Sequence, residues 1–79
     1  MILWLDGRLV AAGEARIDPA DRGFLLADGL FETMRAEAGS VLRLDRHLTR
    51  LRAGAELLGL RIPADDAALR RAMAAVLAA

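Results

Sequence analysis

The residues best suited to chemistry lie in two stretches of the chain, residues 28–35 and residues 44–51. In the first, side chains that alternate across a strand would place Phe31, Thr33 and Arg35 on one side. An aromatic ring, a hydroxyl and a cation on one surface are typical of a small-molecule site. The alternation fits a solvated sheet face equally well, so both interpretations stay open at this point.

The second stretch carries the only histidine of the chain and an arginine that faces inward. At about 100° per residue, His47 and Arg50 fall within the helical arc that carries the apolar residues Leu48, Leu51, Ala55, Leu57 and Leu58. No acid stands three or four residues from Arg50, and an unpaired buried charge is costly, so its anion must come from elsewhere. A carboxylate such as Asp28 or Glu32 would serve, and so would the phosphate of a ligand. The residues by themselves favour the internal salt bridge.

Composition excludes several kinds of chemistry. All 11 basic residues are arginine, so the chain has no lysine side chain that could form a Schiff base. It has no cysteine, which excludes disulfides and thiolate catalysis, and one histidine is too few to indicate a metal site. The formal net charge is zero, so we expect neither a nucleic-acid partner nor a membrane partner.

The length of 79 residues predicts one small domain. Hydrophobic residues make up 56% of the chain, more than the roughly 45–50% of a typical soluble domain. This excess predicts apolar surface that docks against another domain or another copy. The chain starts without a cationic signal-peptide region and has no run near 18 apolar residues, so a soluble cytoplasmic protein is expected.

The N-terminal part is expected to open with a β-hairpin. Asp6-Gly7 suits a type I′ turn and joins apolar runs at 2–5 and 9–12. Residues 21–29 contain two glycines and little periodicity, which predicts a loop whose apolar side chains pack on the sheet.

A second hairpin is expected to follow. It would consist of a strand over 30–38, a turn at Gly39-Ser40 and a return strand over 41–44.

Two helices complete the predicted fold. Asp45 is the expected N-cap of a helix over 46–58 that ends at Gly59, with Arg52 on its solvent side. A second helix is expected to run from about residue 65 to 77. The sequence therefore predicts an α+β domain, a small antiparallel sheet of hairpins with two helices packed on it.

Three motifs occur in order along these elements: Asp-Arg-Gly-Phe at 21–24, Asp-Gly-Leu-Phe-Glu-Thr at 28–33 and Leu-x-x-His-Leu-x-Arg-Leu at 44–51. They resemble the N-terminal domain of the class IV aminotransferases, which are pyridoxal-phosphate enzymes of fold type IV. That family includes D-amino-acid, branched-chain and (R)-amine transaminases and 4-amino-4-deoxychorismate lyase. The first motif is more similar to the D-amino-acid and lyase branches.

The resemblance implies a role for each candidate residue. Arg50 matches the arginine that holds the phosphate of pyridoxal 5'-phosphate, which reverses the preference for an internal salt bridge, and His47 would support it. Phe31, Thr33 and Arg35 match the strand that lines the substrate pocket.

The resemblance also implies that residues 1–79 are a single N-terminal small domain. The Schiff-base lysine of the family lies in a C-terminal domain that this chain lacks, so no catalytic residue is expected here and the chain alone should be inactive. As part of a homodimeric enzyme it would act on an amino acid or amine. One alternative is the small domain of a 4-amino-4-deoxychorismate lyase, in folate and p-aminobenzoate synthesis. Another is a non-catalytic dimerisation or partner-binding module.

Overall fold

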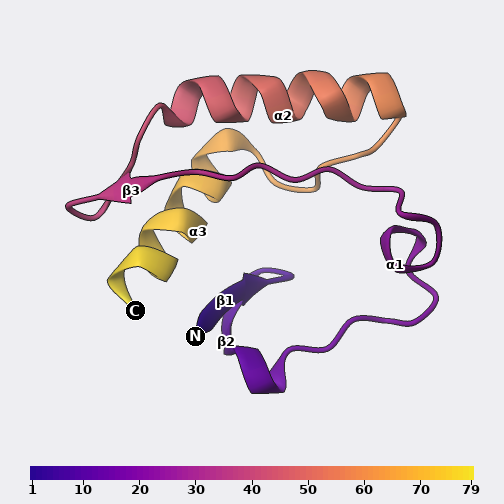
Figure 1. The fold of residues 1–79 in the computed structure, drawn as a ribbon, viewed down its shortest axis with the longest axis horizontal. Helices are drawn as coiled ribbons and strands as arrows, with labels where there is room; N and C mark the ends of the chain where they lie inside the picture. Colours follow the sequence, from indigo (N-terminus) through magenta and orange to yellow (C-terminus); the bar gives the residue numbers. More distant parts are fainter.

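The computed structural model describes all 79 residues and confirms an α+β architecture of two small antiparallel sheets and helices (Figure 1). The elements in chain order are β1 (Ile2–Leu5), β2 (Arg8–Ala11), a 3₁₀ turn η1 (Ala12–Glu14), α1 (Arg22–Leu26), β3 (Ala36–Glu37), β4 (Ser40–Val41), α2 (Leu44–Leu58) and α3 (Asp66–Ala78).

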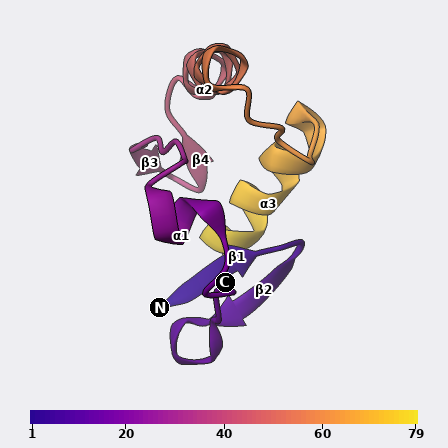
Figure 2. The same cartoon turned by 90° about the vertical axis from the view of Figure 1, so that its right-hand side faces the viewer.

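The elements form three tiers, which are seen in both views (Figures 1 and 2). Helix α2 makes one outer tier, and the segment 28–35 runs beside it as a drawn-out chain. Helix α3 lies in the middle, where it contacts β1, β2 and β4. The β1–β2 hairpin makes the other outer tier. The segment 28–35 therefore lies where it can present side chains to α2.

The first hairpin has the predicted turn. Strands β1 and β2 pair antiparallel from Ile2 opposite Ala11 to Leu5 opposite Arg8. Asp6 and Gly7 both have positive φ, 51° and 96°, as a type I′ turn requires.

The second hairpin is much shorter than predicted. Only Ala36–Glu37 and Ser40–Val41 pair, so the expected strand over 30–38 is wrong for residues 30–35. Those residues make no ladder because no other strand of this chain lies along them. The turn residues are Ala38 and Gly39, with φ of 50° and 79°, one position earlier than predicted. The expected return strand over 41–44 is wrong for residues 42–44, where a turn leads into α2.

Residues 22–26 form helix α1, so the predicted loop over 21–29 is wrong in part. The carboxylate of Asp21 caps this helix by accepting a hydrogen bond from the Gly23 amide at 2.8 Å. The expected packing is also wrong, because Phe24 and Leu25 are 67% and 60% exposed. A helix of one and a half turns has no face long enough to bury both.

Helix α2 begins earlier than predicted. Arg43 has a left-handed backbone with φ of 55° and precedes the first helical residue, so Asp45 lies in the first turn and is not the N-cap. Its negative charge still favours the positive end of the helix. The helix ends at Gly59 as predicted, with φ of 69°. No helix of the chain has the length and apolar character needed to cross a bilayer.

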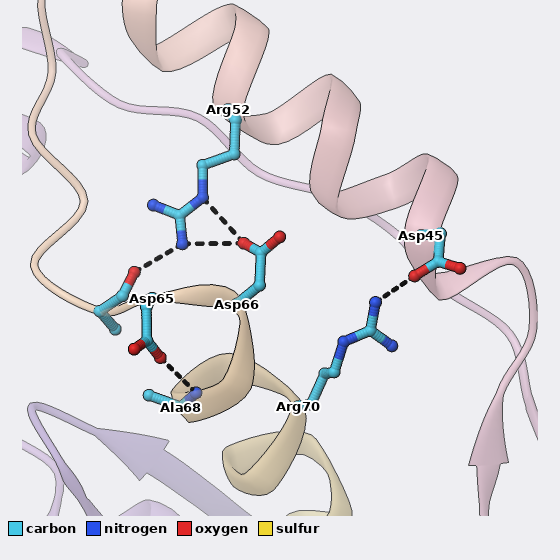
Figure 3. A network of polar contacts seen from close by, with 7 residues as sticks. Asp45, Arg52, Asp65, Asp66, Ala68 and Arg70 are labelled. Carbon is cyan, nitrogen blue, oxygen red and sulfur yellow. Dashed lines mark hydrogen bonds and ion pairs between the residues drawn. The ribbon is translucent and has the colours of Figure 1, made fainter.

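Two ion pairs fasten α2 to α3 (Figure 3). The Arg52 guanidinium contacts the Asp66 carboxylate at 3.0 Å and donates to the Ala64 carbonyl at 2.5 Å. Arg70 of α3 pairs with Asp45 at the start of α2. Arg52 is half-buried, so its predicted place on the solvent side is wrong. Helical periodicity alone could not show that a second helix lies next to this side.

The hydrophobic core of the chain is small. The accessible surface is 6300 Å², whereas a compact protein of 8.5 kDa exposes about 4,700 Å². An open apolar groove of about 390 Å³ between the first hairpin and α3 is lined only by hydrophobic residues, among them Trp4, Met34 and Met73. Only four residues are buried, namely Val10, Leu48, Ala55 and Ala72. Hydrogen bonds and ion pairs between elements therefore contribute an unusually large share of the stability of the fold.

We expect Arg52→Ala to lower the free energy of unfolding by about 1 kcal/mol, because α2 and α3 lose a tie and Ala64 loses a donor. Chemical denaturation measures this loss. The matched control is Arg46→Ala, which removes an exposed arginine of the same helix that makes no hydrogen bond or ion pair. Equal losses in the two variants would contradict the assigned role of Arg52.

Candidate functional site

A carboxylate of the segment 28–35 meets two side chains of α2. The Glu32 carboxylate accepts hydrogen bonds from Arg50 Nε and Arg50 Nη2, each at 3.0 Å. It also lies 3.1 Å from Nδ1 of His47. Only 10% of the Glu32 side chain is exposed. These three residues, hereafter the Glu32 cluster, bring both predicted cofactor-binding residues together around one acid.

Local geometry explains why these residues meet. His47 and Arg50 stand three residues apart on α2 and therefore lie on the same face. Along the segment, Glu32 has the opposite parity to Phe31 and Thr33, so it faces α2 while they face away.

Gly54 allows the segment to come close to the helix. A Cβ built at Gly54 would lie 3.2 Å from Cδ2 of Leu30, so the absence of a side chain makes room for Leu30. Gly54 thus lets the segment 28–35 approach α2 through the side chain of Leu30.

The cluster shifts the acid–base properties of its members. The hydrogen bond from Arg50 lowers the pKa of Glu32 below its ordinary value of 4.5; burial opposes this shift, and His47 reinforces it. The same hydrogen bond raises the pKa of Arg50. Glu32 is thus an ionised acceptor at neutral pH and holds its two neighbours as an anion.

Arg50 keeps part of its binding capacity free. Glu32 takes the edge formed by Nε and Nη2, and Nη1 makes no hydrogen bond within the chain. A guanidinium has five N–H donors, so the outer edge formed by Nη1 and Nη2 still offers a bidentate pair. The Arg50 side chain is 72% exposed, so its predicted inward, partly buried position is wrong and the outer edge is open to solvent.

The two alternatives drawn from the sequence for Arg50 therefore do not exclude each other. The internal salt bridge exists, and Glu32 is its acid. Asp28, the other candidate, instead pairs with Arg22 at 3.0 Å. The guanidinium nevertheless retains donors for a second anion.

Phe31, Thr33 and Arg35 lie on the opposite side of the same segment and are all exposed. Phe31 is 86% exposed, and the Arg35 guanidinium pairs with Glu37 at 2.7 Å. The predicted alternation of side chains is present. The three residues form an open surface, and no second wall stands opposite Phe31.

Sequence reasoning named Glu32 only as one of two partners for Arg50 and gave it no place in the site. No acid stands three or four residues from Arg50 on α2, so its partner had to come from another part of the chain. Strand parity does not identify that partner, because Asp28 and Glu32 both have the opposite parity to the exposed Phe31 and Thr33.

We expect the contribution of the Glu32 cluster to the free energy of unfolding to depend on pH. Because the folded-state pKa of Glu32 is lowered, this contribution is fully present above the ordinary value of 4.5 and is lost as the pH falls through the lowered pKa. The difference in unfolding free energy between the wild type and Glu32→Gln should therefore shrink over this range. Denaturation curves at several pH values measure it. Glu56→Gln on the same helix is the control, and a difference for Glu32→Gln that stays constant would contradict the assignment.

Residues 29–79 match the model of the amino-transferase class IV family. A D-alanine aminotransferase of Bacillus licheniformis is 33% identical over 70 residues, which cover 89% of this chain and 25% of that protein. A D-alanine aminotransferase of Listeria innocua is 34% identical over 70 residues, covering 89% and 24%.

A putative branched-chain-amino-acid aminotransferase of Methanocaldococcus jannaschii is 38% identical over 63 residues, which cover 80% of this chain and 22% of that protein. The chain thus spans a quarter or less of the length of these curated relatives. No solved structure gives a significant match. The family match covers more than half of the chain and includes every residue of the Glu32 cluster, so the chain belongs to the class IV aminotransferases.

Proposed function

We propose that this chain is the small N-terminal part of a pyridoxal-phosphate-dependent class IV aminotransferase, in which Arg50 holds the cofactor phosphate. The observation that carries the proposal is that Arg50, a residue of the motif at 44–51, keeps the outer edge of its guanidinium free. Arginine binds phosphate through such a pair of parallel N–H groups.

The surroundings of Arg50 fit a phosphate. A hollow of about 340 Å³ adjoins the guanidinium and is also lined by Asp45, Arg46 and Thr49. Arg46 adds a second cation, and the hydroxyl of Thr49 is a further donor. His47 does not line this hollow. Its proposed support of the phosphate passes through Glu32, which both His47 and Arg50 contact.

In the proposed enzyme, bound pyridoxal phosphate supplies an electron-accepting ring for the chemistry of a substrate amino group. The residues of this chain bind and orient. Arg50 fixes the phosphate end, while Phe31, Thr33 and Arg35 supply one wall of the pocket for an amino acid or amine. Glu32 connects these two parts of the site, because it belongs to the segment that carries Phe31 and Thr33 and also contacts Arg50.

Transamination requires a lysine as the base for its proton transfers, and this chain contains no lysine. We therefore propose that a lysine-bearing C-terminal domain completes the site, and that the 79 residues alone do not catalyse the reaction. The large exposed surface and the apolar groove beside Trp4 support docking against further protein, including a second copy in a homodimer. A cytoplasmic location stays a prediction.

Two alternatives remain as proposals. A 4-amino-4-deoxychorismate lyase would use the same phosphate grip, so the Glu32 cluster supports it equally. A non-catalytic partner-binding module is supported by the apolar groove, and it differs by having no affinity for the cofactor.

We expect the chain to bind pyridoxamine 5'-phosphate weakly and Arg50→Ala to weaken that binding about 10- to 100-fold, the range for losing charge-assisted hydrogen bonds. Pyridoxamine phosphate is chosen because it has no aldehyde that could react with the amino terminus. Isothermal titration calorimetry measures the affinity.

The matched control is Arg71→Ala, which removes an exposed arginine of α3 that lies outside the hollow. Equal affinity of the wild type and Arg50→Ala would overturn the phosphate assignment. Absence of binding by the folded wild type, with or without a lysine-bearing domain supplied in trans, would favour the partner-binding module.

A further inference from the structure

The Glu32 cluster raises a question about its acid. A carboxylate next to a phosphate-binding arginine lowers the local positive charge, so by charge alone Glu32 should oppose the binding of an anion. Yet it is the most sheltered member of the cluster, with 10% of its side chain exposed against 17% for His47 and 72% for Arg50. This arrangement needs an explanation other than attraction.

Geometry supplies one. An exposed arginine side chain has several rotatable bonds and loses much entropy when it is fixed by a ligand. Glu32 fixes the guanidinium beforehand through Nε and Nη2, at 3.0 Å each. The edge that it leaves free is then held in one orientation, which lowers the entropic cost of binding an anion there.

The carboxylate is itself held in place. Oε1 of Glu32 lies within hydrogen-bond distance of His47 Nδ1 as well as Arg50 Nε, so the acid is anchored to two positions on one face of α2. Because Glu32 belongs to the segment 28–35, the same contacts fix the distance between Arg50 and the exposed Phe31 and Thr33. One carboxylate thus sets both the orientation of the arginine and its spacing from the surface that faces the substrate.

We propose that Glu32 is a positioning residue that orients Arg50 toward a phosphate monoester and fixes it relative to the surface of Phe31 and Thr33. This inference rests on the proposed function, because it takes Arg50 as the phosphate ligand. It assigns Glu32 no contact with substrate or cofactor.

Charge and positioning predict opposite results for Glu32→Gln, which removes the negative charge and one of the two acceptors for Arg50. If charge dominated, pyridoxamine phosphate would bind more tightly. Under the positioning role we expect its affinity to fall about tenfold, as for a lost charge-assisted hydrogen bond. The affinity for pyridoxamine, which has no phosphate, should not change. A general loss of structure would weaken both ligands.

Glu32→Asp separates the two effects in a second way, since it keeps the charge and withdraws the carboxylate by one methylene. We expect it to weaken the binding of pyridoxamine phosphate as well, because placement errors near 1 Å are costly at a bound group. Glu56→Gln is the control, because it makes the same change of charge at an exposed position of α2. Unchanged or tighter binding by both Glu32 variants would overturn the proposal.

Arg50→Ala distinguishes this inference from the proposed function. If Arg50→Ala loses the preference for the phosphorylated ligand while the Glu32 variants keep it, the phosphate site stands and the positioning role fails. If Arg50→Ala keeps the preference, the proposed function fails. In the Arg50→Ala background, Glu32→Gln should have no further effect on this preference.

A measurement on the unsubstituted chain needs no variant and no ligand. Nitrogen-15 relaxation of the Arg50 Nε–H group should show a rigid side chain, as rigid as the backbone of α2, whereas Arg46 should be mobile. Equal mobility of the two arginine side chains would contradict the positioning role directly.

Discussion

The contact of one carboxylate with two side chains of α2 is the constraint on which the site depends. The segment 28–35 has no strand partner within the chain, and it contacts α2 through Glu32 and through the approach of Leu30 to Gly54. In the role that we propose for it, Glu32 fixes the orientation of Arg50 and the distance of Arg50 from Phe31. The position of the site therefore depends on an ionic contact more than on burial.

This dependence follows from the size and shape of the domain. With few fully buried residues and an accessible surface well above that of a compact protein, hydrophobic burial cannot hold every element in place. Ion pairs serve instead at the α2–α3 contact, through Arg52 and Asp66, and at the Glu32 cluster. Ion pairs contribute little to stability when both side chains are exposed. In these two pairs one member, Arg52 or Glu32, is at least half-buried.

Much of the fold could be predicted where local chemistry decides it. Asp6-Gly7 and Gly59 adopt the positive φ that their residue types favour, and strand parity identified the exposed side that carries Phe31. Predictions were wrong where a distant partner decides. The strand over 30–38 needed a neighbouring strand that this chain does not provide, and the side of α2 that carries Arg52 needed knowledge of α3.

The site shows the same division. Periodicity placed His47 and Arg50 on one helical face, but two acids were open as partners of Arg50, and only the three-dimensional arrangement selects Glu32 over Asp28. The sequence also posed salt bridge and phosphate as alternatives. The separate edges of the guanidinium allow both, and this could be seen only once the contacted atoms were known.

We propose that Arg50 holds a phosphate on its outer edge while Glu32 occupies the inner one. The most direct measurement is a nuclear magnetic resonance titration of the arginine side-chain nitrogens with pyridoxamine phosphate. We expect the Nη signals of Arg50 to shift, its Nε–H signal to stay in the hydrogen-bonded position set by Glu32, and the signals of Arg71 to be unaffected. Shifts spread equally over the exposed arginines, or an Arg50 signal that does not respond at saturating ligand, would contradict it.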